Sequence, residues 1–550
     1  MITLYLSALV FALAFLFRKL LIRLLVTSPI DNIPGPTPKS FLKGAFGQVF
    51  NPDAWDFHRE IAETYGSVIK IRSFLGDNWL YIFDPKALHH IVEQYVFEET
   101  DGFIQGNKLA FGEGLLGTLG EQHRKQRKML NPVFSIAHMR EMIPIFYDVG
   151  HKLRGTLLKK VKNGPQEWFI SRLSGKIDVL YWMSRTALEL IGQSGIGYSF
   201  DDLTEERPPH EYAAAYKQFV PASFKFFFIR NYFLPTLVKI GTPKLRRYIV
   251  DLLPGKDVQD LKSIIDIMHD ISVMIYESKK KAIAEGDAAL AGQIGRGKDI
   301  MSILMRANMS ASAEDSLTED EVIGQMSTLT AAATDTTSNA LARVLHLLAQ
   351  NQDAQEKLRR EISEAKGAMA QFDYDQLVSL PYLDAICRET LRLYSPVSMI
   401  PKTARKDTVL PLSNPIKGLD GSEIREIPIP ANTNVIVGIM ASNRNPELWG
   451  PDSYEWKPER WLKPLPNAVS QAHLPGVYSN LMTFLGGGRA CIGFKFSQLE
   501  MKVILSLLIE NFRFSLSDKE IYWQMFGVSA PTVHNSAKSG SQLPLIVERI

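Results

Sequence analysis

One cysteine of this 550-residue chain lies in a segment whose composition suits a ligand-binding loop. Residues 484–493 read Phe-Leu-Gly-Gly-Gly-Arg-Ala-Cys-Ile-Gly, and consecutive glycines let a backbone lie close to a flat ligand. An apolar stretch with helical spacing follows Cys491, and the amides of a helix N-terminus stabilise a thiolate. Arg489 stands two residues before the cysteine, where it can pair with a carboxylate. This pattern predicts that Cys491 is a metal ligand or a nucleophile.

Cysteine count and overall charge narrow the class of protein. Cys387 is the only other cysteine, so the chain lacks a disulfide framework and suits a reducing compartment. The net charge is +3 and 45% of the residues are hydrophobic, an ordinary globular composition. A charge this small gives no reason to expect nucleic acid as a partner.

A second group of polar residues lies in the middle of a predicted long helix. Residues 332–337 read Ala-Ala-Thr-Asp-Thr-Thr, and a Thr beside an Asp is locally unfavourable there because both compete for backbone hydrogen bonds. Such a pair is either a solvent-facing polar patch or a functional site.

Two further pairs of residues stand at helical spacing. Glu389 and Arg392 are three residues apart and share one helix face, as charged helix surfaces often do. His123 and Arg127 are four residues apart within a basic run, and both side chains can donate to a carboxylate. The alternative for this run is a solvated helix face.

Hydrophobic patterning predicts a mainly α fold with a minor β part. Residues 68–72 and 79–83 are expected as strands, and helices dominate from about residue 121 to 350. Thr318 and Glu321 form a capping-box pattern at the start of a helix that runs to about Gln350, about 50 Å at ~1.5 Å per residue. Strands and turns follow in 401–439, an irregular part in 444–471, and a last helix in about 493–511.

The N-terminus predicts a membrane anchor. Residues 2–17 carry no charge, and Arg18, Lys19 and Arg23 follow, so the C-terminal side is expected to face the cytosol. No basic region precedes the apolar run and no cleavage site follows it, which argues against a removed signal peptide; a buried core helix is the alternative. We expect an anchor in 1–28, a proline-rich hinge in 29–40 and a catalytic domain in 41–550.

The cysteine segment resembles a known family. Residues 484–493 match, position for position, the haem-binding loop Phe-x-x-Gly-x-Arg-x-Cys-x-Gly of the cytochrome P-450 family, and the resemblance covers about residues 33–550. It implies one large haem-thiolate fold that binds haem b. Cys491 would be the axial ligand of the iron, Arg489 would bind a haem propionate, and Phe484 would pack near the sulfur.

Distant segments resemble other motifs of this family. Residues 332–337 are similar to its oxygen-activation motif, with Ala333 where glycine is usual. The resemblance implies that the Thr336 hydroxyl lies at the iron-bound oxygen and that Asp335 feeds protons to it. It also implies that Arg460, in the segment Pro-Glu-Arg-Trp at 458–461, joins the 389/392 pair in a structural triad.

The resemblance extends to the residues that hold the haem propionates. His123 replaces the usual Trp of the propionate-binding helix, and Arg127 stands one turn later. Lys402 occupies a strand position where Arg usually reaches a propionate, and Arg405 is a possible substitute.

The activity implied is insertion of one oxygen atom from O2 into a lipophilic small molecule, such as a terpenoid or another specialised metabolite. No dinucleotide or flavin signature is present, so the resemblance implies electrons from an NADPH–cytochrome reductase and a single-pass protein of the endoplasmic reticulum membrane with a cytosolic catalytic domain. A basic docking face is expected at Arg124, Lys125, Lys128 and Lys495. A haem-thiolate isomerase or dehydratase that needs no O2, and a non-enzymatic haem sensor or carrier, remain as alternatives.

The resemblance also marks segments that contact substrate. Most residues there are apolar and none carries a fixed charge: Phe103, Ile104, Leu115, Thr328, Leu329, Ala332, Val397, Met399, Ile400 and Val528. An aromatic cluster stands where the family has its access lid, and it is expected either to dip into a bilayer or to be helix core: Phe224, Phe226, Phe227, Phe228, Tyr232 and Phe233.

Overall fold

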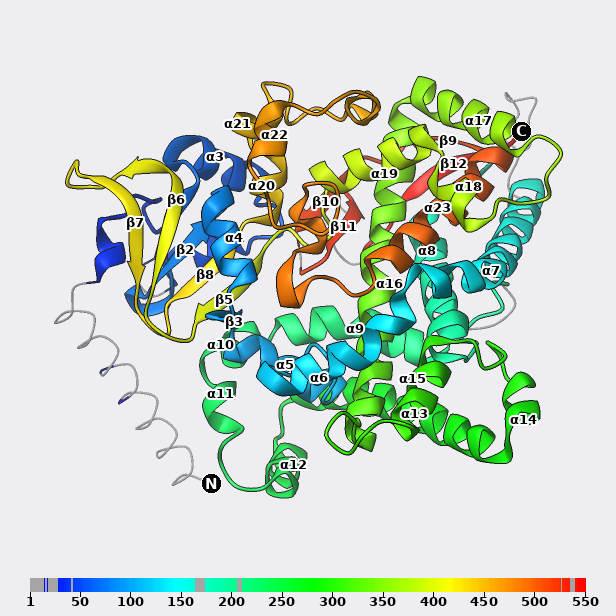
Figure 1. Cartoon of the computed structure of the whole chain (residues 1–550), viewed down its shortest axis with the longest axis horizontal. Helices are drawn as coiled ribbons and strands as arrows, with labels where there is room; N and C mark the ends of the chain where they lie inside the picture. Colours follow the sequence, from blue (N-terminus) through cyan, green and yellow to red (C-terminus); the bar gives the residue numbers. More distant parts are fainter. Residues whose placement is uncertain are drawn as a thin grey trace.

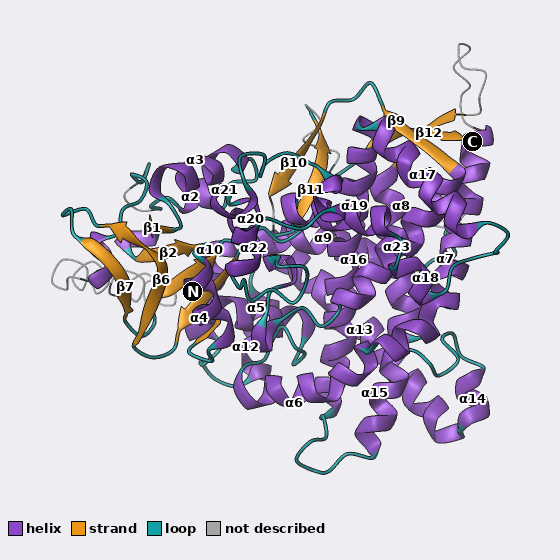
Figure 2. Ribbon diagram, turned by 45° about the horizontal axis from the view of Figure 1, so that its top comes forward, coloured by secondary structure: helices purple, strands orange, loops and turns teal. Residues whose placement is uncertain are grey.

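The computed structural model describes residues 28–40, 43–163, 174–204, 210–525, 527–534 and 540–550, together with residues 14 and 17. The expected anchor in 1–28 therefore lies almost wholly outside the described residues. Within the described ranges, no helix combines the length and the apolar composition needed to cross a membrane. The fold is mainly α with a minor β part, as expected. Its largest sheet lies on one side of the molecule and the helices make up most of the rest (Figures 1 and 2).

The largest sheet brings together segments from both halves of the chain. Its order is β1-β2-β8-β5-β3, with β2 and β8 parallel and the other neighbours antiparallel. The expected strand at 68–72 is confirmed, and the next begins one residue early. The strands are β1 (Val68–Arg72), β2 (Asn78–Ile82), β3 (Phe97–Glu99), β5 (Ile400–Ala404) and β8 (Asn434–Val437).

Three smaller sheets complete the β part. β6 (Thr408–Lys417) and β7 (Glu423–Ile429) form a hairpin, as the turn-rich sequence of 401–439 predicts. The C-terminal strands were not anticipated: β10 (Ile521–Met525) pairs with β11 (Ser529–Val533), and β12 (Pro544–Arg549) pairs with β4 (Ser174–Asp178) and β9 (Phe512–Leu516).

Helices dominate residues 121–350 and the last helix is close to its predicted bounds, whereas the helices before residue 121, those between 352 and 378 and the short ones in the expected irregular part were not predicted. The helices are α2 (Phe46–Val49), α3 (Trp55–Tyr65), α4 (Pro85–Glu93), α5 (Asp101–Phe111), α6 (Gly120–Leu130), α7 (Ile136–Asn163), α8 (Val179–Leu190), α9 (Glu211–Phe224), α10 (Phe227–Tyr232), α11 (Leu234–Leu237), α12 (Pro243–Leu252), α13 (Lys256–Glu285), α14 (Asp287–Ala291), α15 (Ile300–Met309), α16 (Glu319–Gln350), α17 (Gln352–Lys366), α18 (Tyr374–Val378), α19 (Pro381–Leu393), α20 (Ile439–Arg444), α21 (Pro446–Trp449), α22 (Asn467–Gln471) and α23 (Phe494–Asn511).

The long helix α16 crosses the helical part of the molecule (Figure 1). The predicted capping box is confirmed: Thr318 accepts from the Glu321 amide, and the Glu321 carboxylate accepts from the Thr318 amide over 2.9 Å. The helix packs so closely on the loop before α6 that a Cβ on Gly324 would collide with the backbone of Gly114. α16 is therefore held in the core, not on the surface.

The proline-rich segment packs on the largest sheet. Ile30 and Ile33 are buried, and the Lys70 amide donates to the Pro34 carbonyl over 2.8 Å. The same apolar core that contains Ile30 reaches Val547 near the C-terminus. Residues 29–40, expected as a hinge, thus contribute side chains to the core of the globule.

Candidate functional site

The Cys491 loop runs between a 3-10 turn at Gly487–Arg489 and helix α23. The Cys491 amide donates to the Phe484 carbonyl over 2.8 Å, and the Phe484 ring packs 5.5 Å from the Tyr478 ring. Cys491 is exposed, yet burial raises the pKa of its thiol, while the Gly493 amide and the charge of Arg127 act in the opposite direction. An exposed side chain that is also desolvated faces an enclosed space within the protein.

The glycines of this loop are needed mainly for contacts with protein. A Cβ on Gly486 would collide with the Pro475 carbonyl, and one on Gly487 with the Val92 carbonyl. Gly487 also has φ +59°, a left-handed conformation that favours glycine. Close approach of a flat ligand, the reason inferred from sequence, is not what these two positions require in the structure.

A short stretch of α16 faces open space although the helix is in the core. Ala332 is exposed, and Asp335 and Thr336 are half-buried, whereas the residues on both sides of this stretch are buried. The Thr336 hydroxyl donates to the Ala332 carbonyl over 2.7 Å. The next residue, Thr337, donates to Ser497 of α23 over 3.1 Å. This stretch therefore lies beside the helix that follows Cys491.

Asp335 has the properties of a proton donor. Burial raises the pKa of its carboxyl group to about 6, and the neighbouring Tyr216 hydroxyl of α9 opposes the shift. The Tyr216 hydroxyl donates to the Ala331 carbonyl over 2.7 Å, which holds α9 against this part of α16. A carboxyl group with such a pKa can hold and release a proton near neutral pH.

A hollow of about 410 Å³ brings the predicted carboxylate-binding residues together. His123, Arg127, Lys402 and Arg489 all line it, so the structure assembles this set from α6, β5 and the Cys491 loop. Arg127 donates to the Ala490 carbonyl over 2.6 Å and so ties α6 to the loop. We call these four residues the cationic cradle.

The side chains of the cradle are held by specific contacts. Burial, then the charge of Arg489, lowers the pKa of His123 to about 3, so this imidazole is neutral. Arg489 donates to the carbonyls of Leu115 (3.1 Å) and Thr118 (2.6 Å). These bonds hold the Arg489 guanidinium against the loop that precedes α6.

One carboxylate that pairs with residues of the cationic cradle was not predicted from the sequence. Glu99 lies 2.9 Å from the Arg489 guanidinium and 3.0 Å from the Lys402 ammonium, and these cations hold the pKa of its carboxyl group below the usual value despite burial. Arg405 pairs with Glu98 and Asp101 and is not among the residues that line the hollow, so its role as a substitute stays a prediction. Glu99 lies on a three-residue strand and belongs to no motif, so nothing in the neighbouring sequence marks it as a functional residue.

The predicted triad is present, with Glu389 and Arg392 fully buried and Arg460 half-buried. Arg392 donates two bonds to Glu389, over 2.8 and 2.9 Å, and both side chains are 0% exposed. Arg460 lies 3.5 Å from the same carboxylate. The Trp461 indole and the Lys457 amide also donate to the Glu389 carboxylate, each over 3.0 Å. The triad joins α19 to the segment before the cysteine loop, which is a structural role.

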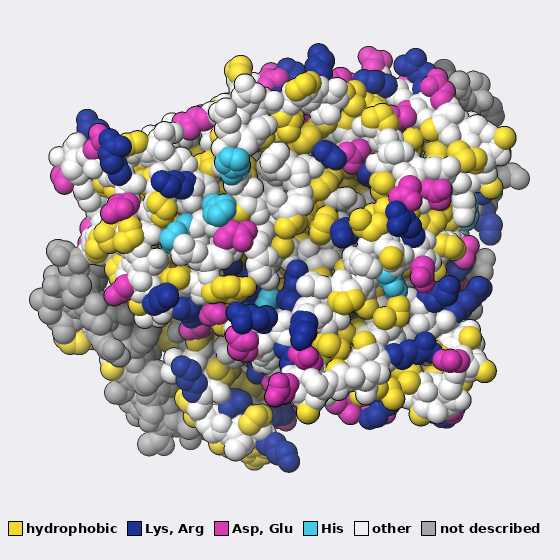
Figure 3. Space-filling model, viewed as in Figure 1, with side chains coloured by type: hydrophobic (Ala, Val, Ile, Leu, Met, Phe, Trp, Pro, Cys, Tyr) yellow, Lys and Arg dark blue, Asp and Glu magenta, His cyan; other side chains and the backbone are white. Residues whose placement is uncertain are grey.

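The expected basic docking face is largely paired with acidic residues. Arg124 pairs with Glu121 over 2.7 Å and Lys128 with Asp315 over 2.8 Å. Lys125 is turned onto the buried Glu321, so it does not serve as a surface cation. Figure 3 shows Lys and Arg side chains interspersed with acidic ones on the face that carries α5 and α6.

The residues expected to contact substrate are mostly apolar and buried or half-buried. The Thr328 hydroxyl is buried and has no hydrogen-bond partner among the described residues. The others are buried or half-buried, with Ala332 exposed: Phe103, Ile104, Leu115, Leu329, Val397, Met399, Ile400 and Val528.

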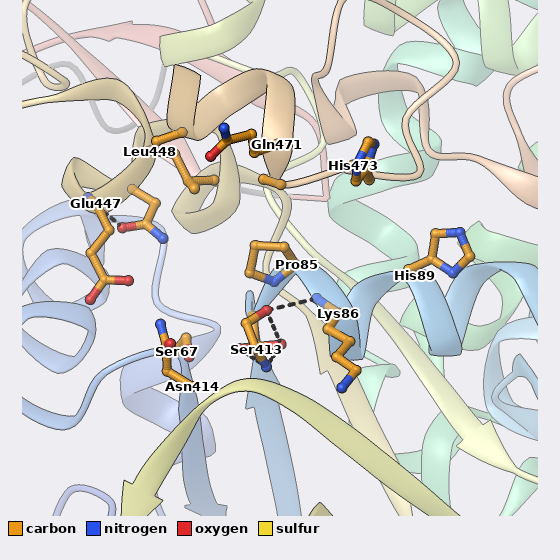
Figure 4. A pocket seen from close by; sticks show the side chains of 14 residues that line it. Ser67, Pro85, Lys86, His89, Ser413, Asn414, Glu447, Leu448, Gln471 and His473 are labelled. Atoms are coloured by element: carbon orange, nitrogen blue, oxygen red, sulfur yellow. Dashed lines mark hydrogen bonds between the residues drawn. The ribbon is translucent and has the colours of Figure 1, made fainter. Parts of the chain in front are cut away.

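A second hollow, of about 570 Å³, lies away from Cys491 (Figure 4). It is lined by residues of α4, β6, α21 and α22, and the side chains of His89 and His473 border it. Asp84 at its edge accepts from the amide and the hydroxyl of Ser413. Its polar groups serve these local bonds, and none of the residues predicted from sequence lines it.

The site and fold agree with comparisons with known proteins. The family model for cytochrome P-450 matches residues 33–534. Cytochrome P-450 monooxygenase 91 of Postia placenta is 52% identical over 537 residues, 97% of each chain, and monooxygenase 212 of the same fungus is 51% identical over 94% of this chain and 93% of its own. A protein named ganoderic acid synthetase, from Ganoderma lucidum, is 45% identical over 94% of each chain.

This chain belongs to the cytochrome P-450 family. It is an oxidoreductase of the monooxygenase type, and its cofactor is haem b with thiolate-bound iron. The residues present fit that group, because a desolvated thiol faces an enclosed space and a cationic cradle lies next to its loop.

Proposed function

We propose that this enzyme inserts one oxygen atom from O2 into a lipophilic small molecule above a haem held by Cys491. The observation that carries the proposal is the accessible Cys491 thiol just before α23, a helix that is bonded to the middle stretch of α16 where Asp335 and Thr336 are half-buried. Bound haem supplies the oxygen-activating chemistry, favoured by electron donation from the thiolate. In this proposal His123, Arg127 and Arg489 hold the haem carboxylates, and Phe484 packs beside the sulfur.

The protein's own contribution to the reaction is proton delivery. Asp335 holds a proton on its carboxyl group, and the Thr336 hydroxyl passes it into the space in front of α16. Tyr216 orients Asp335 from α9. These groups stand in a stretch that is otherwise lined by apolar side chains, which keeps competing water out.

A lipophilic substrate, of terpenoid type, suits this lining. None of the residues that we expect to contact substrate carries a charge, so recognition rests on burial of apolar area with a single hydroxyl, that of Thr328, available for orientation. The name of the Ganoderma lucidum relative, ganoderic acid synthetase, supports a terpenoid substrate.

Electrons are proposed to come from an NADPH–cytochrome reductase. Haem-dependent oxygen insertion requires two electrons, and the sequence carries no flavin or dinucleotide signature. Of the residues expected to dock the reductase, Lys495 has no acidic partner among the residues that the structure describes, and its ammonium lies 5.6 Å from the Phe494 ring beside the Cys491 loop. We place the docking site around Lys495.

We also propose that the protein is anchored in the endoplasmic reticulum membrane by residues 1–28, with its catalytic domain in the cytosol. Support comes from the charge-free run of residues 2–17 and from an apolar surface over α10, α11 and α12. Its exposed side chains are Phe224, Phe228, Ile229, Leu237, Ile240, Leu245, Tyr248, Ile249, Leu252 and Leu253. An exposed apolar set of this size suits contact with lipid.

Turnover in a reconstituted system tests the proposed function. The purified protein, NADPH and a fungal reductase should convert lipophilic terpenoids to products that carry one oxygen atom from labelled O2. Conversion without O2 and NADPH would establish an isomerase or dehydratase. Absence of any conversion, with a haem that responds only to ligand binding, would favour a sensor or carrier.

A further inference from the structure

One carboxylate, that of Glu99, contacts the cationic cradle and has no role in the proposed chemistry. Glu99 of β3 and Lys402 of β5 are direct cross-strand partners in the sheet, 303 residues apart in the chain. Opposite charges in such register are held by the strand pairing itself. Both side chains are almost fully buried, at 6% and 3% exposure, and the only polar partner of the ammonium among the described residues is Glu99.

The charges of the cationic cradle and of Glu99 do not cancel. Arg127, Arg489 and Lys402 are three cations, Glu99 is the one anion that contacts them, and His123 is neutral. The other charged residues that line the hollow are committed elsewhere: Glu98 pairs with Arg405, Arg124 with Glu121, and Lys128 with Asp315. Two positive charges are left unmatched, and haem b carries two carboxylates.

We propose that Glu99 is a positioning residue that sets this charge balance: it neutralises Lys402, so that Arg127 and Arg489, beside the neutral His123, are the two cations that serve the haem carboxylates. Lys402, which the resemblance assigns to a propionate, is on this account the partner of Glu99 and not of the cofactor. The inference rests on the haem site proposed above. A buried charge left without its partner is costly, so removal of either member alone should shift how firmly haem is held.

The test is a double-mutant cycle on the full-length holoenzyme, with the rate of haem transfer to excess apomyoglobin as the measurement. Lys402→Met leaves Glu99 to compete for Arg489, and it should speed haem loss by about tenfold. Glu99→Gln frees both cations for the haem carboxylates, and it should slow haem loss by about threefold. The double variant Glu99→Gln/Lys402→Met replaces an ion pair by a neutral pair, and it should return to within about twofold of wild type.

The matched control is Glu423→Gln, because Glu423 pairs with Arg425 on the β6–β7 hairpin and neither residue lines the hollow; its haem loss should equal that of wild type. The proposal is overturned if the double variant loses haem as fast as Lys402→Met, since Lys402 then binds the cofactor directly. If Glu99→Gln does not fold, the comparison of Lys402→Met with the double variant still shows whether Lys402 is the partner of Glu99 or of the cofactor. A wild-type protein without a thiolate-type haem spectrum would instead refute the haem site itself, so the two failures are distinguishable.

Discussion

The Thr337 hydroxyl donates a hydrogen bond to the Ser497 hydroxyl over 3.1 Å, and this bond joins α16 to α23. Thr337 directly follows Thr336, and Ser497 lies on the first turn of the helix that follows Cys491. The bond therefore fixes the proposed proton-delivery residues relative to the proposed iron ligand.

Thr336→Ala should uncouple the enzyme while leaving substrate binding and haem reduction intact. The variant loses the hydroxyl that passes protons, so product formed per NADPH should fall by up to ~10²-fold, with oxygen diverted to hydrogen peroxide. The product-to-peroxide ratio, measured with reductase supplied, checks this. Thr336→Ser should restore coupling, and Thr334→Ala, whose buried hydroxyl is bonded to the Thr330 carbonyl, is the matched control. Unchanged coupling in Thr336→Ala would show that the Thr336 hydroxyl has no part in proton delivery.

Coupling should also depend on pH through Asp335. The pKa of its carboxyl group is raised to about 6, so the proton-donating form is populated below that pH and lost as the pH rises through it. Product formed per NADPH should therefore fall between pH 5.5 and 7.5 in the wild type. Asp335→Asn should have low coupling with a flat profile over the same range. A parallel decline in both proteins would assign the pH dependence to another group.

Glu389→Ala should destabilise the fold beneath the cysteine loop. Removal of this carboxylate leaves Arg392 buried without its charged partner, at a cost of roughly 3–5 kcal/mol in the free energy of unfolding, and haem incorporation should be lost. Arg460→Ala should act in the same direction. Glu459→Ala, which breaks the half-exposed pair with Lys357, is the control, with an expected cost below about 1 kcal/mol. Wild-type haem content and melting temperature in Glu389→Ala would be incompatible with a structural triad.

Deletion of residues 1–28 should release the protein from membranes only in part, with its haem spectrum intact. The apolar surface over α10–α12 remains and should still bind vesicles of neutral lipid. Further substitution of Ile240, Leu252 and Leu253 by Ser should abolish this residual binding, as flotation of vesicles would show. Loss of the haem spectrum on deletion alone would place the segment in the core.

The parts of this account that were predictable from sequence depend on local signals. The ends of α16 follow from the capping box at Thr318, and the Cys491 loop from ten consecutive residues. The triad could be predicted because each member lies in a short motif with its own spacing.

What sequence reasoning missed depends on pairing between distant segments. The contact of Glu99 with Lys402 exists only because β3 pairs with β5, and neither strand signals this register by itself. Lys125 was predicted to be a surface cation, but in the fold its ammonium pairs with the buried Glu321 of α16. In the same way, the reason for Gly486 and Gly487 lies in backbone segments that fold against them, and these are not visible along the chain.

The identity of the iron ligand is the central claim, and the spectrum of the reduced carbon monoxide complex tests it most directly. Wild type and Cys387→Ser should both show the long-wavelength Soret band of a thiolate-bound haem, because Cys387 is buried in the core and burial raises the pKa of its thiol to about 12. Cys491→Ser should lack that band while remaining folded. Persistence of the band in Cys491→Ser would contradict the assignment, and its loss in Cys387→Ser would transfer the role to that residue.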